Sequence, residues 1–116
     1  MSKIEEFNSY REKMNDKILN KANLEIKRFF ALDSQTYNEG VLSSKVKELL
    51  GLVASLVLRC NDCITYHILQ CHKLGVTEEE FYEAFNVALV VGGSIVIPHL
   101  RKAVEIVEEC NSSFNN

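Results

Sequence analysis

The residues with the clearest chemical potential lie in one short segment that contains two cysteines and a histidine. Cys60 and Cys63 are three positions apart, and His67 follows four positions after Cys63. A helix beginning near Asn61 or Asp62 would place Cys63 in its first turn, where unpaired backbone N–H groups and the helix dipole favour a thiolate. His67 would lie one turn further along the same face, where its imidazole can take or return a proton.

Cys60 precedes this predicted helix. Its separation from Cys63 allows the two sulfurs to form a bond without unwinding the backbone, so one thiol can attack a substrate and the other can resolve the product. Cys63 is the better-placed nucleophile, because it has both the helix N-terminus and His67. The segment therefore predicts a redox-active dithiol.

A metal site is the main alternative for the same segment, because cysteine and histidine are the ligands that zinc prefers. Within one helix, however, the Cα atoms of Cys63 and Cys71 would be roughly 12 Å apart. A single ion with Zn–S bonds of about 2.3 Å cannot easily bridge them. A smaller site stays open, with Cys60, Cys63 and His67 as ligands and a fourth from His72, His99 or a carboxylate.

The remaining cysteines and histidines have simpler explanations. Cys71 and Cys110 have no partner at a telling spacing, and free cysteines often serve as small apolar packing residues. His72 and His99 are expected at the surface or in packing, and Tyr66 fits the core as well as the wall of a site. We assign none of them to the site.

Helical periodicity dominates the chain, so helices must hold the dithiol. Apolar residues recur at steps of three and four, and no hairpin or alternating pattern competes. We predict an all-α fold of five or six helices joined by short turns. The expected helices cover approximately residues 3–20, 24–38, 45–59, 62–73, 77–89 and 94–110.

Turn and cap residues mark several of these ends. Gly40 can adopt the left-handed conformation that ends a helix, and Ser43 or Ser44 can cap the next one. Thr77 and Glu80 fit a capping box.

The last helix should follow the glycine pair at positions 92 and 93. Ser94 can cap it, and Pro98 is tolerated only near its first turns. We expect it to end near Cys110 and to leave a loose tail at 111–116.

Length and composition limit the function classes. With 116 residues, of which 47% are hydrophobic, the chain suits one folded domain over 1–116 that begins with a helix within 1–22. A net charge of −3 gives no electrostatic reason to expect nucleic acid or an anionic membrane as a partner. The polar N-terminus lacks a secretory signal, and no apolar run approaches the roughly 20 residues of a membrane span. We therefore expect a cytoplasmic protein.

One pattern resembles a known family. Glu48, eleven further residues, Cys60-x-x-Cys63, three residues and His67 are similar to the motif of AhpD-like alkylhydroperoxidases, in the carboxymuconolactone decarboxylase superfamily. The likeness extends from about Leu24 to Val107. It implies an all-helical subunit that forms trimers or hexamers and a thiol-dependent peroxidase or disulfide reductase. Its substrate would be a hydroperoxide or a disulfide. Lipoyl-protein or other thiols would reduce the oxidised protein, and no cofactor is expected.

The resemblance also implies roles for four residues. Cys63 would be the attacking thiol, Cys60 its disulfide partner, His67 the base and Glu48 the end of a proton relay. From the residues alone, Glu48 is equally a capping or solvated carboxylate, and a bend, a steep helix crossing or a water would be needed to connect it to His67. The sequence departs from AhpD at Asp62, where AhpD has a histidine, and an acid there would raise the pKa of a neighbouring thiol.

Two further interpretations concern function without a dithiol. A structural or binding subunit is suggested by the apolar segment Ala88–Pro98, which one small subunit cannot readily bury. We expect that segment in a subunit interface whichever activity is correct. Lactone decarboxylation, the other branch of the superfamily, offers no reason for a vicinal dithiol.

Overall fold

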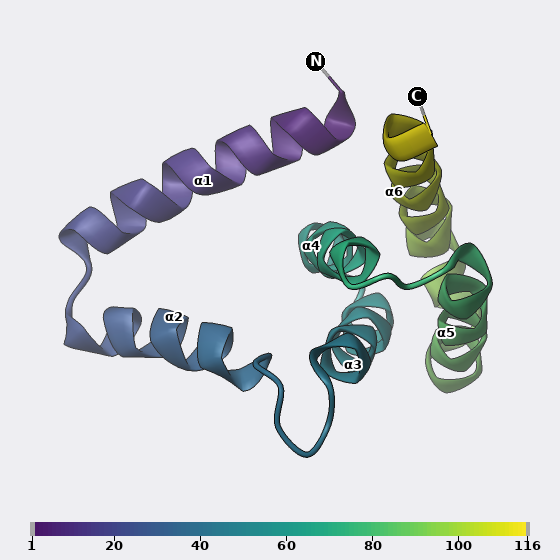
Figure 1. Cartoon of the computed structure of the whole chain (residues 1–116), viewed down its shortest axis with the longest axis horizontal. Coiled ribbons are helices and arrows are strands. Elements are labelled where there is room, and N and C mark those ends of the chain that lie inside the picture. Colours follow the sequence, from purple (N-terminus) through teal and green to yellow (C-terminus); the bar gives the residue numbers. More distant parts are fainter. Residues whose placement is uncertain (1, 116) are drawn as a thin grey trace. The chain divides into compact units, whose positions relative to one another are not determined.

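The protein is described here by a computed structural model that covers residues 2–115, with side chains to residue 112. Over residues 2–115 it forms six α-helices, one short 3-10 helix and no strand, which confirms the predicted all-α class. None of these helices is long and apolar enough to span a bilayer. The α-helices (Figure 1) are α1 (Lys3–Lys21), α2 (Leu24–Thr36), α3 (Ser44–Val57), α4 (Asn61–Lys73), α5 (Glu78–Gly92) and α6 (Ile97–Asn115).

The chain divides after Asn38 into two compact units. The first contains α1 and α2, which Ser2 and Asn23 cap by accepting backbone N–H bonds from Glu5 and Ile26. α1 matches the helix expected within 1–22, and neither α1 nor α2 contains a buried residue. That the chain is one domain over 1–116 stays a prediction.

The second unit is built around α3. This helix packs against both α4 and α5, and α4 packs in turn against α6. The strongly apolar sequence of α3 is therefore central, as expected, although only one of its faces is buried. Large side chains that fill this core are Leu52, Leu56, Ile64, Ile68, Phe81, Phe85 and Val107.

The turn from α3 to α4 has an unusual backbone. The Arg59 N–H donates to the Leu56 carbonyl, and the Cys60 N–H donates to the Ser55 carbonyl. This pair of bonds is a Schellman motif, whose left-handed residue is usually glycine. Gly75 fills that position after α4 with φ 84°, whereas Arg59 has φ 59°. A left-handed conformation costs a residue with a Cβ about 1–2 kcal/mol.

Several predicted caps are confirmed. The Ser43 hydroxyl accepts the Val46 N–H at the start of α3. Thr77 and Glu80 form the capping box, each side chain accepting the other's backbone N–H. Pro98 is the second residue of α6, where its missing N–H leaves no helical bond unmade.

The predicted end of the second helix is wrong. α2 ends at Thr36, so Gly40 lies several residues beyond the helix. Its φ is not positive. At the last residue of α2, the Thr36 hydroxyl donates to the Leu32 carbonyl.

The last helix differs from its prediction at both ends. Ser94 lies inside the 3-10 helix Ser94–Val96, and its side chain caps neither helix start. α6 continues to Asn115 instead of ending near Cys110. Within this extension, the Asn111 amide donates to the Glu78 carboxylate of α5 at 3.4 Å. The final residue of the predicted loose tail, Asn116, lies outside the described residues.

Candidate active site

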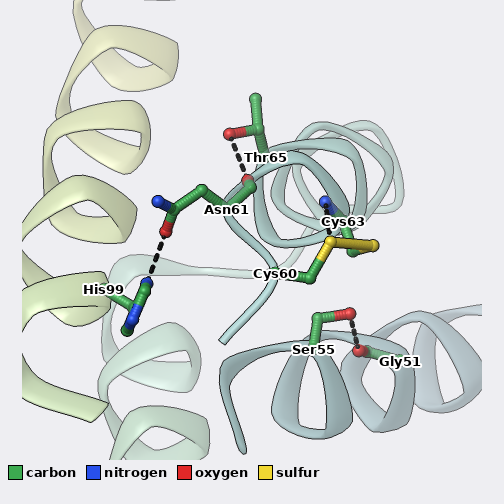
Figure 2. The surroundings of a disulfide bond; sticks show 7 residues. All are labelled: Gly51, Ser55, Cys60, Asn61, Cys63, Thr65 and His99. Atoms are coloured by element: carbon green, nitrogen blue, oxygen red, sulfur yellow. Dashed lines mark hydrogen bonds between the residues drawn. A yellow bond between two sulfur atoms is a disulfide. The ribbon is translucent and has the colours of Figure 1, made fainter. Parts of the chain in front are cut away.

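Cys60 and Cys63 form a disulfide at the start of α4 (Figure 2). Cys60 is the N-cap residue and Cys63 is the third residue of the helix, so their Cα atoms are 5.3 Å apart. Cys63 is exposed, whereas Cys60 is half-buried. Cys63 is therefore the more exposed residue of the disulfide.

The helix N-terminus acts on both sulfurs. The Cys63 backbone N–H lies 3.2 Å from Cys60 Sγ and donates to it. Cys60 Sγ thus takes the place that a serine or aspartate oxygen takes in an ordinary N-cap. The sequence assigned this stabilisation to Cys63 alone, but the structure also gives Cys60 a share of it, since this N–H favours negative charge on the Cys60 sulfur.

His67 and Glu48 form a buried pair that joins α4 to α3. His67 Nδ1 lies 2.7 Å from Glu48 Oε2, and the two residues are 8% and 4% exposed. A carboxylate partner requires the proton of the neutral imidazole to be on Nδ1, which makes Nε2 the basic nitrogen. His67 lies one helical turn after Cys63, so this imidazole is suited to proton exchange with the thiol.

The Glu48–His67 contact is direct and needs no bridging water. Glu48 lies nine residues before the end of α3, and His67 lies six residues after the first residue of α4. At 1.5 Å per residue, their distances from the turn differ by only about 4–5 Å. The long glutamate side chain spans this offset.

Gly51 is a site residue that the sequence analysis missed. A Cβ added at Gly51 would lie 2.6 Å from His67 Cε1 and 2.9 Å from each ring nitrogen, so the imidazole occupies the space of a side chain. An isolated glycine inside a helical pattern costs about 1 kcal/mol relative to alanine. A glycine kept inside a helix despite this cost often has a packing or functional reason. The position of Gly51 within the helical pattern was therefore the available sequence signal.

One face of α3 supports the whole site. Glu48, Gly51 and Ser55 follow one another at steps of three and four, which aligns them on the helix surface. The Ser55 carbonyl accepts the Cys60 N–H at 3.1 Å. The Ser55 hydroxyl donates to the Gly51 carbonyl at 2.7 Å (Figure 2). The dithiol and the histidine are thus held by the same element.

His99 is a second residue that the sequence analysis undervalued. It lies on α6 and is half-buried, with Nδ1 2.8 Å from Oδ1 of Asn61 (Figure 2). Asn61 is the first residue of α4, and its carbonyl accepts the Thr65 hydroxyl. His99 therefore ties the start of α4 to a different helix, beyond the surface or packing role expected for it.

The other cysteines behave as packing residues. Burial, with a smaller contribution from the charge of Glu48, raises the pKa of Cys71 to about 12. Burial, followed by the charge of Glu109, raises the pKa of Cys110 to about 11. Both thiols stay protonated and poorly nucleophilic near neutral pH.

Tyr66 lies beside the site. Its ring meets the His67 ring edge-on, with centroids 5.4 Å apart. Over the described part of the chain, no group of three or more histidine, cysteine, aspartate or glutamate side chains has the arrangement of a metal site.

A separate apolar groove lies between α3 and α5 and has a volume of about 800 Å³. Its lining includes Leu50, Val53, Val57, Val87 and Val91. Neither cysteine of the disulfide lines it, and His67 does not line it either. The groove is therefore not the space in which a substrate would meet the disulfide.

Comparisons with solved structures agree with this fold. A crystal structure of a Thermotoga maritima protein is 53% identical, with a TM-score of 0.94, and the match covers 96% of this chain and 97% of that one. A second Thermotoga maritima structure, 52% identical with a TM-score of 0.92 and coverage of 96% and 94%, is described as a carboxymuconolactone decarboxylase family protein with a suggested part in the antioxidative response. A Legionella pneumophila member of that family shares the fold, at 24% identity, a TM-score of 0.86 and coverage of 95% and 98%.

Sequence comparison gives the family directly. An uncharacterized Paracoccus denitrificans protein of the cox locus is 27% identical over 85 residues, which are 73% of this chain and 77% of that protein. The sequence profile of the Carboxymuconolactone decarboxylase family matches residues 26–106. Together with the resemblance drawn from the motif, these matches show that the chain belongs to the carboxymuconolactone decarboxylase family.

Proposed function

We propose that this protein is a thiol-dependent peroxidase that cycles between a dithiol and a disulfide. The observation that carries the proposal is the disulfide between Cys60 and Cys63 at a helix start, one turn from a histidine held by a buried carboxylate. The antioxidative role suggested for the similar Thermotoga maritima protein supports it. Cys63, Cys60, His67 and Glu48 are the residues to which we assign the chemistry.

In the oxidative half of the cycle, His67 takes the Cys63 thiol proton. The thiolate attacks one peroxide oxygen, the O–O bond breaks, and the leaving alkoxide receives the proton from His67 as an alcohol. Cys63 becomes a sulfenic acid. The Cys60 thiol then attacks the Cys63 sulfur, the S–O bond breaks, and water and the disulfide form. Glu48 stabilises the imidazolium between these steps.

In the reductive half, an external dithiol such as a dihydrolipoyl protein returns two electrons. Its thiolate attacks the sulfur of Cys63, the more exposed residue, and expels Cys60, whose charge the Cys63 N–H stabilises. The reductant's second thiolate then attacks the reductant sulfur of this mixed disulfide. The bond to Cys63 breaks, Cys63 leaves as a thiol, and the reductant is left as a disulfide. Run in reverse, with the reduced Cys60–Cys63 dithiol as electron donor, this exchange would let the protein reduce disulfide substrates. Because a reduced dithiol requires a reducing compartment, we place this cycle in the cytoplasm.

Serine variants of the two cysteines test the assignment of roles. In Cys60→Ser, one equivalent of hydroperoxide should leave a Cys63 sulfenic acid that dimedone traps, because no resolving thiol is present. In Cys63→Ser, no such adduct should form and peroxide consumption should be lost. Equal trapping at Cys60 in Cys63→Ser would contradict the proposed order of attack.

Two other functions remain as rivals. The family name points to lactone decarboxylation, but that reaction gives no role to a disulfide at the site. A non-redox module, structural or metal-bound, predicts that mild hydroperoxide leaves all four thiols unchanged. Peroxide-dependent loss of two thiols distinguishes the proposed function from both.

A further inference from the structure

We propose that Gly51 is a positioning residue whose missing side chain seats the His67 imidazole against α3. The proposal deepens the function proposed above and rests on it for its catalytic meaning. Gly51 lies one turn after Glu48, the residue that binds His67 Nδ1. The ring is thus fixed by a bond at Nδ1 and by contact of its edge with the backbone at Gly51.

The distances from an added Cβ at Gly51 show how closely the His67 ring approaches α3. The three nearest atoms to an added Cβ are all atoms of the His67 ring, at 2.6, 2.9 and 2.9 Å. Carbon atoms pack at about 3.5–4.0 Å, so even alanine would push the ring away by about 1 Å. The ring cannot swing aside freely, because Glu48 holds it and His67 is only 8% exposed.

A displacement of this size matters for proton transfer. A shift of about 1 Å in a positioned group can reduce a rate on the order of a hundredfold. We therefore expect Gly51→Ala to slow peroxide-driven formation of the Cys60–Cys63 disulfide by about ten- to a hundredfold. The two cysteines themselves remain unchanged in this variant.

The chain offers two matched glycine-to-alanine controls. A Cβ at Gly92 would meet Val96 Cγ2 at 2.5 Å, which is an equally severe clash that involves no ring atom of His67. A Cβ at Gly40 would have only an ordinary contact, 3.7 Å from Lys47 Nζ. Gly92→Ala therefore reports the effect of a packing defect, and Gly40→Ala reports the effect of losing a glycine.

Imidazole NMR of the oxidised protein is the direct test, and it needs no enzymatic activity. The His67 Nδ1 proton, bonded to Glu48, should give a slowly exchanging low-field signal. In Gly51→Ala this signal should move or disappear, while Gly92→Ala and Gly40→Ala keep it. An unchanged His67 signal in folded Gly51→Ala overturns the positioning role. If the signal is lost in the variant but the native protein has no peroxide activity, only the proposed function is overturned.

A second measurement keeps the proposal testable if Gly51→Ala does not fold. In a His67→Ala background the clash is gone, and alanine is the better helix former. Gly51→Ala should then raise the urea midpoint of His67→Ala, although it lowers the midpoint of the native protein or prevents its folding. The proposal fails if Gly51→Ala lowers both midpoints equally, or prevents folding of the double variant while His67→Ala alone folds.

Discussion

His67 can be buried because Glu48 Oε2 lies 2.7 Å from its Nδ1. Burying an imidazole without a partner would cost free energy and would leave its tautomer undefined. The sequence predicted the two cysteines and the histidine from local spacing, since all three lie within eight residues. The partnership with Glu48 depends on how α3 and α4 pack, and a single sequence pattern supplied it only through the family resemblance.

Replacing Glu48 by glutamine tests the charge of that pair. The amide oxygen can still accept a hydrogen bond from Nδ1–H, but it lacks the negative charge that stabilises an imidazolium. We expect disulfide formation by hydroperoxide to slow by about 10- to 100-fold, measured by stopped-flow thiol loss. Glu83→Gln, which alters an exposed carboxylate of α5, should leave the rate unchanged. Equal rates in the two variants would remove Glu48 from the mechanism.

Cys71 should make the protein less stable at alkaline pH. Burial raises the pKa of the Cys71 thiol from 9.0 to about 12, so between these two pH values the thiol of the unfolded chain loses its proton first. Stability is unaffected below pH 9 and falls as the pH rises above it. At pH 10 the loss in the free energy of unfolding is about 1.4 kcal/mol for one such group.

Urea unfolding of the oxidised protein at pH 8 and pH 10 measures this loss, because Cys60 and Cys63 do not titrate in the disulfide. Cys71→Ala should show a smaller decrease between the two pH values than the native protein. Parallel decreases would mean that the thiol of Cys71 ionises normally in the fold.

At the scale of helices, local signals were reliable where a side chain caps its own helix. Ser43 and the Thr77–Glu80 box act within four residues, so sequence alone predicts them. The failures were long-range or conformational. In the unpredicted extension of α6, Asn111 bonds to Glu78 of another helix. Arg59 adopts a left-handed conformation that arginine, as a residue type, does not predict.

Glycine in place of Arg59, in the turn before Cys60, should stabilise the protein. Arg59→Gly relieves the left-handed strain but makes the unfolded chain more flexible, so the net gain should be about 0.5–1 kcal/mol. Gly75→Ala, at the equivalent position after α4, should destabilise by about 1 kcal/mol. Chemical denaturation of both variants checks the pair. Destabilisation by Arg59→Gly would show that the arginine side chain, and not its backbone, is needed at this turn.

At the scale of the whole molecule, much apolar surface is exposed in the single chain. In the first unit Phe29 is 68% exposed, and in the second Val90 is 86% and Val91 66% exposed. Exposed apolar area of this kind marks interaction surfaces. The segment Ala88–Pro98 contributes several of these residues, and its place in a subunit interface stays a prediction.

Sedimentation tests that prediction. We expect a species several times the 13.2 kDa of one chain at micromolar concentration. Val91→Lys should shift it toward the monomer by placing a charge on the exposed apolar face, whereas Lys102→Glu, on the exposed side of α6, should not. A sharp monomer for the native protein would contradict the interface.

The most direct test of the central claim is mass spectrometry after oxidation. The fully reduced protein is treated with one equivalent of hydroperoxide, alkylated under denaturing conditions and digested. The account predicts one Cys60–Cys63 disulfide per peroxide consumed, with Cys71 and Cys110 fully alkylated. Four alkylated cysteines and unconsumed peroxide would contradict it.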